Sequence, residues 1–172
     1  MTKEEGGSMA QYCVVVSNGT RARFFTLQPA QVPELESGPN LIEHNALVNT
    51  EREAASNELW SENKTGRNRA PKGGPAHGYD DHRSRHQDEY ERRFASSIAE
   101  ECCRLSDRHR PSDVVLVAQK RMLGFLRNAM ESRLNGVATH EIPKDLSKLT
   151  PRELHEHLAR TSILPRRKSP AA

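Results

Sequence analysis

The sequence has 172 residues, a length suited to one domain or to one domain with terminal extensions. Hydrophobic residues make up 34% of it, and 26 basic against 23 acidic side chains leave a net charge of +3. This balance excludes disorder by charge repulsion and does not identify a nucleic-acid-binding protein by total charge. No apolar run approaches the ~20 residues that cross a bilayer. Residues 1–10 lack the apolar segment of a secretory signal, and three cysteines form no disulfide framework, so a cytoplasmic protein without a membrane segment is expected.

The N-terminal part predicts a leader followed by three strands. Residues 1–10 are polar and predict a flexible leader, after which a single domain is expected over residues 11–164. Residues 12–16 are a β-branched apolar run, typical of a strand buried on both faces. Asn18-Gly19 follows and is a strong hairpin signal, so residues 21–27 should return as a second strand. A third strand is expected over residues 41–48 after a Gly-Pro break.

Residues 49–81 predict a long loop between the third strand and the first helix, because they carry few apolar side chains and many glycines and prolines. A loop of this length inside a compact domain is usually functional or disordered. Four cations occur in it without an intervening acidic residue: Lys64, Arg67, Arg69 and Lys72. A mobile cationic loop suits phosphate contacts with RNA, and a solvated linker is the alternative.

The remaining chain predicts alternating helices and strands. A helix is expected over residues 83–107, where apolar side chains three or four apart share one face, followed by a strand over 114–118. A helix with Met122 and Leu126 on its apolar stripe comes next, then a strand over 136–142. The last helix opens with a capping box at Thr150 and Glu153, and residues 165–172 predict a basic, flexible tail.

This order predicts a single α/β domain with a mixed five-stranded sheet and helices on its faces. The first three strands should be antiparallel and the last two parallel, an arrangement of the ribonuclease-H-like kind.

Carboxylates and histidines predict no catalytic or metal site. Residues 12–17 contain no Asp or Glu, so the metal cage of a ribonuclease-H-like nuclease is not expected. His77, His82 and His86 lie close together in the sequence beside two aspartates, but no cysteine is near, and solvated histidines are the favoured interpretation. We therefore predict no catalytic residue, no metal and no cofactor.

Two shorter basic segments are weaker candidates for anion binding. Lys120 and Arg121 lie where a predicted strand ends and a helix begins, a position where backbone N–H groups can bind an anion. A structural turn is the alternative there. Arg166, Arg167 and Lys168 form a second run in the tail, for which a solvated, charged tail is the alternative.

An ordered set of short motifs is similar to a known family. Residues 14–25, VVVSNGTRARFF, resemble the opening of the bacterial host attachment proteins, which are described as required for attachment to host cells. The resemblance extends from Met9 to about Leu164. Its other motifs are Gly66-Arg67, Phe94-Ala95, Leu116-Val117-Ala118, Leu123-Gly124-Phe125-Leu126-Arg127 and Lys144-Asp145-Leu146.

The family looks like the central domain of the eukaryotic and archaeal class-1 translation release factors. That likeness implies a ribonuclease-H-like fold without the nuclease site. In release factors, the loop of this region carries a Gly-Gly-Gln tip that helps water attack the peptidyl-tRNA ester. The nearest match here is Gly73-Gly74-Pro75, so Gly73 and Gly74 are a candidate loop tip, whereas proline has no amide to position water.

Three functions are compatible with the sequence. The first is a non-catalytic cytosolic module that associates with RNA or the ribosome through the basic residues 64–72. The second is an attachment-related protein that acts indirectly through a protein partner, because no export signal is seen. The third is a peptidyl-tRNA hydrolase-like activity at the loop tip.

Overall fold

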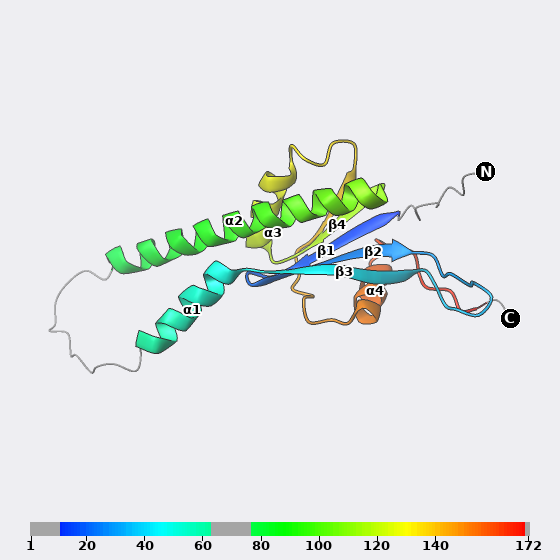
Figure 1. Cartoon of the computed structure of the whole chain (residues 1–172), viewed down its shortest axis with the longest axis horizontal. Coiled ribbons are helices and arrows are strands. Elements are labelled where there is room, and N and C mark those ends of the chain that lie inside the picture. The colour runs from blue at the N-terminus through cyan, green and yellow to red at the C-terminus, as the bar shows by residue number, and fades with distance from the viewer. Residues whose placement is uncertain (1–10, 63–76, 171–172) are drawn as a thin grey trace, which may run out of the picture.

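The structure is a computed structural model that describes residues 11–62 and 77–170, with the backbone alone described at residues 56, 58–62 and 77–81. Its strands form one mixed five-stranded sheet in the order β3-β2-β1-β4-β5 (Figure 1). The strands are β1 (Tyr12–Ser17), β2 (Arg21–Gln28), β3 (Asn40–Val48), β4 (Asp113–Val117) and β5 (Ala138–Ile142). The predicted mixed α/β sheet is confirmed, including its strand directions: β1, β2 and β3 are antiparallel neighbours, and β1, β4 and β5 are parallel neighbours.

The β1–β2 turn is fixed by Asn18. Its backbone N–H donates to the carbonyl of Arg21 at 2.9 Å. Its side-chain Oδ1 accepts from the backbone N–H groups of Thr20 and Arg21, each at 2.8 Å. The Asn-Gly signal in the sequence therefore marks a real turn, closed by the asparagine side chain.

The helices are α1 (Thr50–Glu62), α2 (His77–His109), α3 (Lys120–Met130) and α4 (Pro151–Arg160). The predicted loop over residues 49–81 is wrong where α1 and the start of α2 occupy it, and residues 63–76 lie outside the described part of the chain.

The helix α1 was not predictable from apolar periodicity, because its sequence has no apolar stripe. Polar contacts define it. Asn49 precedes it and accepts from the N–H of Arg52 at 3.4 Å through Oδ1 and from the N–H of Glu53 at 3.1 Å through its carbonyl. Glu51 and Glu53 lie in the first turn, where the helix dipole favours negative charge.

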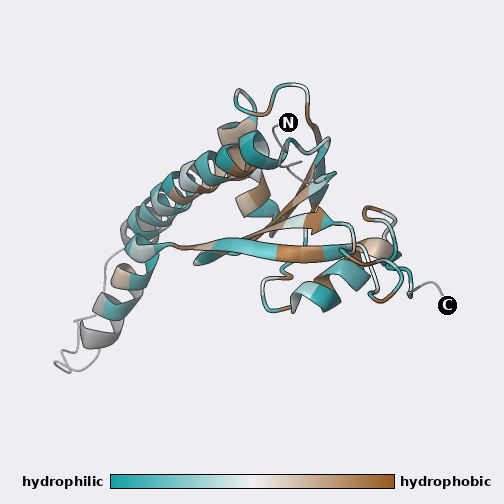
Figure 2. Cartoon of the chain, turned by 45° about the vertical axis from the view of Figure 1, so that its right-hand side comes forward, coloured by the Kyte–Doolittle hydropathy of each residue, from teal (hydrophilic) through white to brown (hydrophobic). Residues whose placement is uncertain are grey.

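Helices cover both faces of the sheet. One core lies under α2 and α3 and includes Phe24, Ile98 and Leu126. The other lies under α4 and includes Phe25 and Leu154. The strands β1 and β4 contribute to both, which explains their uninterrupted apolar sequences, and the hydrophobic residues gather accordingly on the sheet in Figure 2.

The helix α1 and the N-terminal half of α2 project past the end of the sheet (Figure 1). Among the described side chains of α2, from residue 82 on, the buried ones begin at Glu91 and continue through Phe94 and Ile98 to Leu105. Residues 82–87 are all exposed, and this half of α2 is mainly hydrophilic in Figure 2.

The C-terminal segment, expected from the sequence to be a flexible tail, makes hydrogen bonds beside the sheet within residues 165–170. The N–H of Lys168 donates to the carbonyl of Gly38 at 2.7 Å, and the N–H of Gly38 donates back at 3.1 Å. His155, 1% exposed, donates from Nε2 to the carbonyl of Pro165 at 2.8 Å. Leu164 is buried in the core under α4 and anchors the segment that follows it. Composition could not show the pairing of Lys168 with Gly38, because it joins distant parts of the chain.

Candidate functional site

A polar cleft of about 390 Å³ lies at the carboxyl ends of the parallel strands β1 and β4. The β1–β2 turn, the first turn of α1, the middle of α2, the start of α3 and the loop after β5 all contribute to its lining. This edge is where open α/β sheets place their ligands. The cleft is therefore the first candidate site of the fold.

Glu91 is the central charge of the cleft and is 5% exposed. Its Oε1 accepts from Arg52 Nη1 at 3.0 Å and from Gln87 Nε2 at 3.3 Å. Its Oε2 contacts Arg121 Nε at 3.1 Å, and the same guanidinium also pairs with Asp88. Two guanidinium groups thus offset the cost of burying one carboxylate.

Gly19 makes room for this network. A Cβ atom on Gly19 would overlap the guanidinium of Arg52. The carbonyl of Gly19 accepts from Asn49 Nδ2 at 3.2 Å, and the carbonyl of Thr20 accepts from Asn49 N–H at 2.7 Å. The β1–β2 turn and the start of α1 are thereby joined at one wall of the cleft.

The two residues predicted to bind an anion, Lys120 and Arg121, lie in different surroundings. The helix α3 begins at Lys120 directly after β4, as expected, and its N-cap Gln119 makes no side-chain capping bond. Arg121 lines the cleft, but its guanidinium is engaged by Glu91 and Asp88. Lys120 is exposed and does not line the cleft. Anion binding at these two residues stays a prediction.

Charge in the cleft is balanced. Arg52 and Arg121 face Glu91 and Asp145 among its lining residues. Asp145 accepts from the hydroxyl of Ser147 at 2.5 Å. The cleft is therefore suited to a polar ligand and not, by its charge, to an anion.

Sequence reasoning missed Arg52, Gln87, Glu91 and Asp145 as members of one site. Arg52 lies in a segment expected to be a loop, and Glu91 is an acidic residue among other charges at the edge of a helical stripe. The Arg52–Glu91 pair joins residues 39 apart, so no local pattern indicates it.

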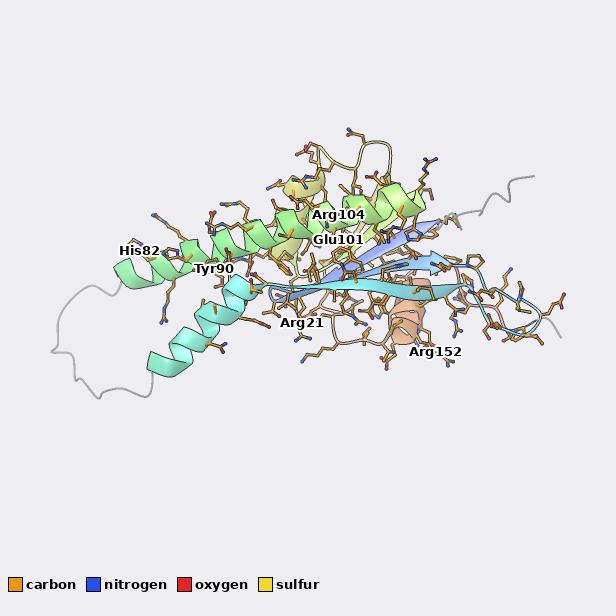
Figure 3. The ribbon with its side chains drawn as sticks, in the orientation of Figure 1. Arg21, His82, Tyr90, Glu101, Arg104 and Arg152 are labelled. Carbon is orange, nitrogen blue, oxygen red and sulfur yellow. The ribbon has the colours of Figure 1, made fainter. Side chains whose placement is uncertain are left out.

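Of the other site residues predicted from the sequence, some lie within the described part of the chain and some outside it. The basic run Lys64, Arg67, Arg69 and Lys72 and the candidate tip Gly73-Gly74 lie outside the described residues. Of the three histidines, His82 is exposed on α2 (Figure 3), and the His86 ring stacks on Tyr90 with centroids 6.5 Å apart. Within residues 11–62 and 77–170, no group of three or more His, Cys, Asp or Glu side chains is arranged to hold a metal ion.

Two buried cysteines belong to the core. Cys13 on β1 and Cys102 on α2 are both 0% exposed. A hydrogen bond to Cys102 and burial together raise the pKa of the Cys13 thiol well above its ordinary value. Both side chains act as small hydrophobic groups.

A family model described as "protein required for attachment to host cells" matches residues 13–158. The chain belongs to this family. The match confirms the host attachment resemblance seen in the sequence, whereas the likeness to release factors stays a prediction. No curated protein matches the chain.

In this host attachment protein, the family match runs from β1 to α4 and contains every residue that lines the polar cleft. The match ends at Leu158, before the C-terminal segment that pairs with Gly38. None of the described helices is long and apolar enough to cross a membrane.

Proposed function

We propose that this host attachment family protein is a non-catalytic cytoplasmic module that associates with RNA or the ribosome, in a role related to that of release-factor central domains. The supporting observation is the projection formed by α1 and the first half of α2 (Figure 1). These helices end and begin at Glu62 and His77, so they flank the basic run of residues 64–72 in the sequence. The described ends of both helices therefore lie away from the body of the protein, on either side of the basic run in the sequence.

The surface of the projecting helix supports contacts with phosphates. Arg85 is exposed on α2 in this half of the helix. Aromatic residues make up 5% of the chain, so base stacking contributes little. RNA binding should therefore show weak sequence preference and a strong dependence on salt.

A non-catalytic role is supported by the chemistry of the candidate tip. Gly73-Gly74 is followed by Pro75, which has neither a side-chain amide nor a backbone N–H. In the polar cleft, the buried carboxylate of Glu91 is already engaged by Arg52 and Arg121. An effect on host attachment is then indirect, through the RNA or through a protein partner.

The test is RNA binding and ribosome co-sedimentation at low and high salt. The variant K64A/R67A/R69A/K72A should lose most of its affinity for a single-stranded RNA. The slope of log binding constant against log salt concentration should become shallower by ~3, since each phosphate contact contributes ~0.7. The control variant R104A/R108A/K144A/K148A removes the same charge from exposed positions elsewhere and should bind like the wild type. Absence of the wild type from the ribosome fraction at low salt, or equal losses in both variants, would overturn the proposal.

A peptidyl-tRNA release assay tests the non-catalytic part separately. The wild-type protein should release no peptide above background. Release by the wild type that disappears in Gly73→Ala or Gly74→Ala would show that the protein is a hydrolase instead.

A further inference from the structure

A second cleft of about 480 Å³ lies between α4 and the C-terminal segment. One carboxylate, Glu156, lines it. Its cationic lining residues are Arg152, Arg160, Arg166, Arg167 and Lys168. This lining carries four net positive charges, more than the +3 of the whole chain, so the described cleft concentrates the protein's excess charge.

The C-terminal wall of the cleft is held in place by the sheet. Lys168 forms two backbone hydrogen bonds with Gly38, at 2.7 and 3.1 Å. Arg167 donates from Nε to Asn40 Oδ1 at 3.0 Å. The cations of this segment therefore lie on an ordered backbone, which lowers the entropy lost when they bind a ligand.

The other wall is one face of α4. Arg152, Glu156, Ala159 and Arg160 are spaced four, three and one residues apart, so they lie on the same side of the helix. Ala159 is 8% exposed, and its small side chain leaves space between the two arginines. Figure 3 shows Arg152 at α4, on the side of the sheet opposite α2.

The single carboxylate neutralises little of this charge. Arg152 Nε lies 3.4 Å from Glu156 Oε1, and their side chains are 75% and 47% exposed. Such a pair contributes little in water. The arginines of this cleft therefore keep donor groups for an anion, in contrast to Arg52 and Arg121 of the polar cleft, which share a buried carboxylate.

We propose that this cleft binds a ligand that carries two or more adjacent phosphate groups. Arginine forks on opposite walls can each hold one phosphate through paired charge-assisted hydrogen bonds, and the hydroxyl groups of Ser37 and Ser169 add donors. The volume falls in the range of ~300–1,000 Å³ that small-ligand sites occupy. No aromatic side chain lines the described cleft, so the phosphates are recognised and an attached base is not.

This phosphate site depends neither on the family match nor on the proposed RNA binding. Arg160 and the cations of the C-terminal segment lie beyond the matched residues 13–158. Figure 1 shows α4 on the sheet, away from the outer ends of α1 and α2 that flank the basic run 64–72. The two candidate anion sites can therefore be tested separately in one protein.

The test is calorimetric titration of the full chain with inorganic pyrophosphate at low salt. The variant R166A/K168A should weaken pyrophosphate binding by about tenfold or more, because it removes two of the charged groups and leaves the backbone pairing with Gly38 intact. The matched control R104A/R108A removes two exposed arginines from α2 and should bind pyrophosphate like the wild type. Melting curves check that each variant is folded.

A second arm identifies the source of the phosphates. If R166A/K168A also weakens binding of a single-stranded RNA about tenfold and pyrophosphate displaces that RNA, the ligand is a nucleic-acid backbone. If only pyrophosphate binding weakens, the ligand is a free phosphorylated compound. The variant K64A/R67A/R69A/K72A should keep full pyrophosphate affinity, whatever happens to its RNA affinity. Absence of pyrophosphate binding to the wild type, or an equal loss in R104A/R108A, would overturn this inference.

Discussion

Gly19 has no room for a side chain, because the guanidinium of Arg52 on α1 occupies that space. The guanidinium of Arg52 lies over Gly19 and reaches the buried Glu91. Gly19 has no positive φ, so its need for glycine comes from this close approach and not from backbone strain. The Asn-Gly pair thus serves both the β1–β2 turn and the polar cleft.

The substitution Gly19→Ala should destabilise the protein by about 1–2 kcal/mol, because the new methyl group displaces Arg52 from Glu91. Urea unfolding measures the change. In an Arg52→Ala background the same substitution should have almost no further effect, since the guanidinium is already gone. Equal costs in both backgrounds would show that Gly19 is required for another reason.

Glu91→Gln should destabilise the fold by about 1–3 kcal/mol, since it leaves Arg52 and Arg121 without their shared carboxylate. The exposed Arg93–Glu51 pair, at 3.1 Å, is the matched control, because it also joins α1 to α2. Glu51→Gln should change the free energy of unfolding by less than about 0.5 kcal/mol. Similar changes in the free energy of unfolding for the two substitutions would contradict the argument that burial makes the Glu91 carboxylate important.

At the level of elements, sequence periodicity predicted every strand and the helices α2, α3 and α4. The three helices bury apolar faces, as Phe94 and Ile98 do on α2 and Leu154 and Leu158 do on α4. Apolar periodicity did not predict α1, because this helix depends on the Asn49 cap and on ion pairs with α2. Partners of that kind come from distant sequence, so the cleft that α1 helps to form was also missed.

The capping box of α4 was predicted from the sequence, and the structure confirms it. Thr150 Oγ1 accepts from the N–H of Glu153 at 3.3 Å, and Glu153 Oε2 accepts from the N–H of Thr150 at 2.9 Å. These hydrogen bonds from Thr150 hold the pKa of Glu153 below its ordinary value.

Thr150→Ala should lower the melting temperature by about 2–4 °C, because it removes one half of this box. Ser97→Ala, which truncates an exposed hydroxyl within α2, should leave the melting temperature unchanged within about 1 °C. A Thr150→Ala protein that melts with the wild type would show that α4 is held by its buried leucines alone.

For the whole molecule, the sequence showed that its charge is nearly balanced but not where the charge collects. The run of residues 64–72 and the tail cations were both visible as local patterns. The pairing of Lys168 with Gly38, which places the tail cations opposite α4, was not. A cleft with four net positive charges thus arises from two segments that appear unremarkable when considered separately.

Stability should fall as the solution is acidified from about pH 7.5 to about pH 5.5. His44 and His109, with ring centroids 4.9 Å apart, have pKa values lowered below 6.5, in both cases mainly by burial. Below that value the unfolded chain takes up protons that the folded chain resists, so the folded state loses stability.

Melting curves at several pH values measure this effect. The variant H44Q/H109Q should show a shallower decline between pH 7.5 and 5.5, whereas His82→Gln, at an exposed position, should retain the wild-type decline. An unchanged slope in the double variant would assign the pH dependence to other groups.

The helix α2 has 33 residues, and its described apolar side chains that are buried against the sheet and α3 lie in its second half. Amide hydrogen exchange should therefore divide this one continuous helix into two regions. Amides before Glu91 should exchange through local opening, at rates that do not depend on global unfolding. Amides between Phe94 and Leu105 should exchange only when the core opens, so their protection should fall in parallel with the stability lost in Glu91→Gln.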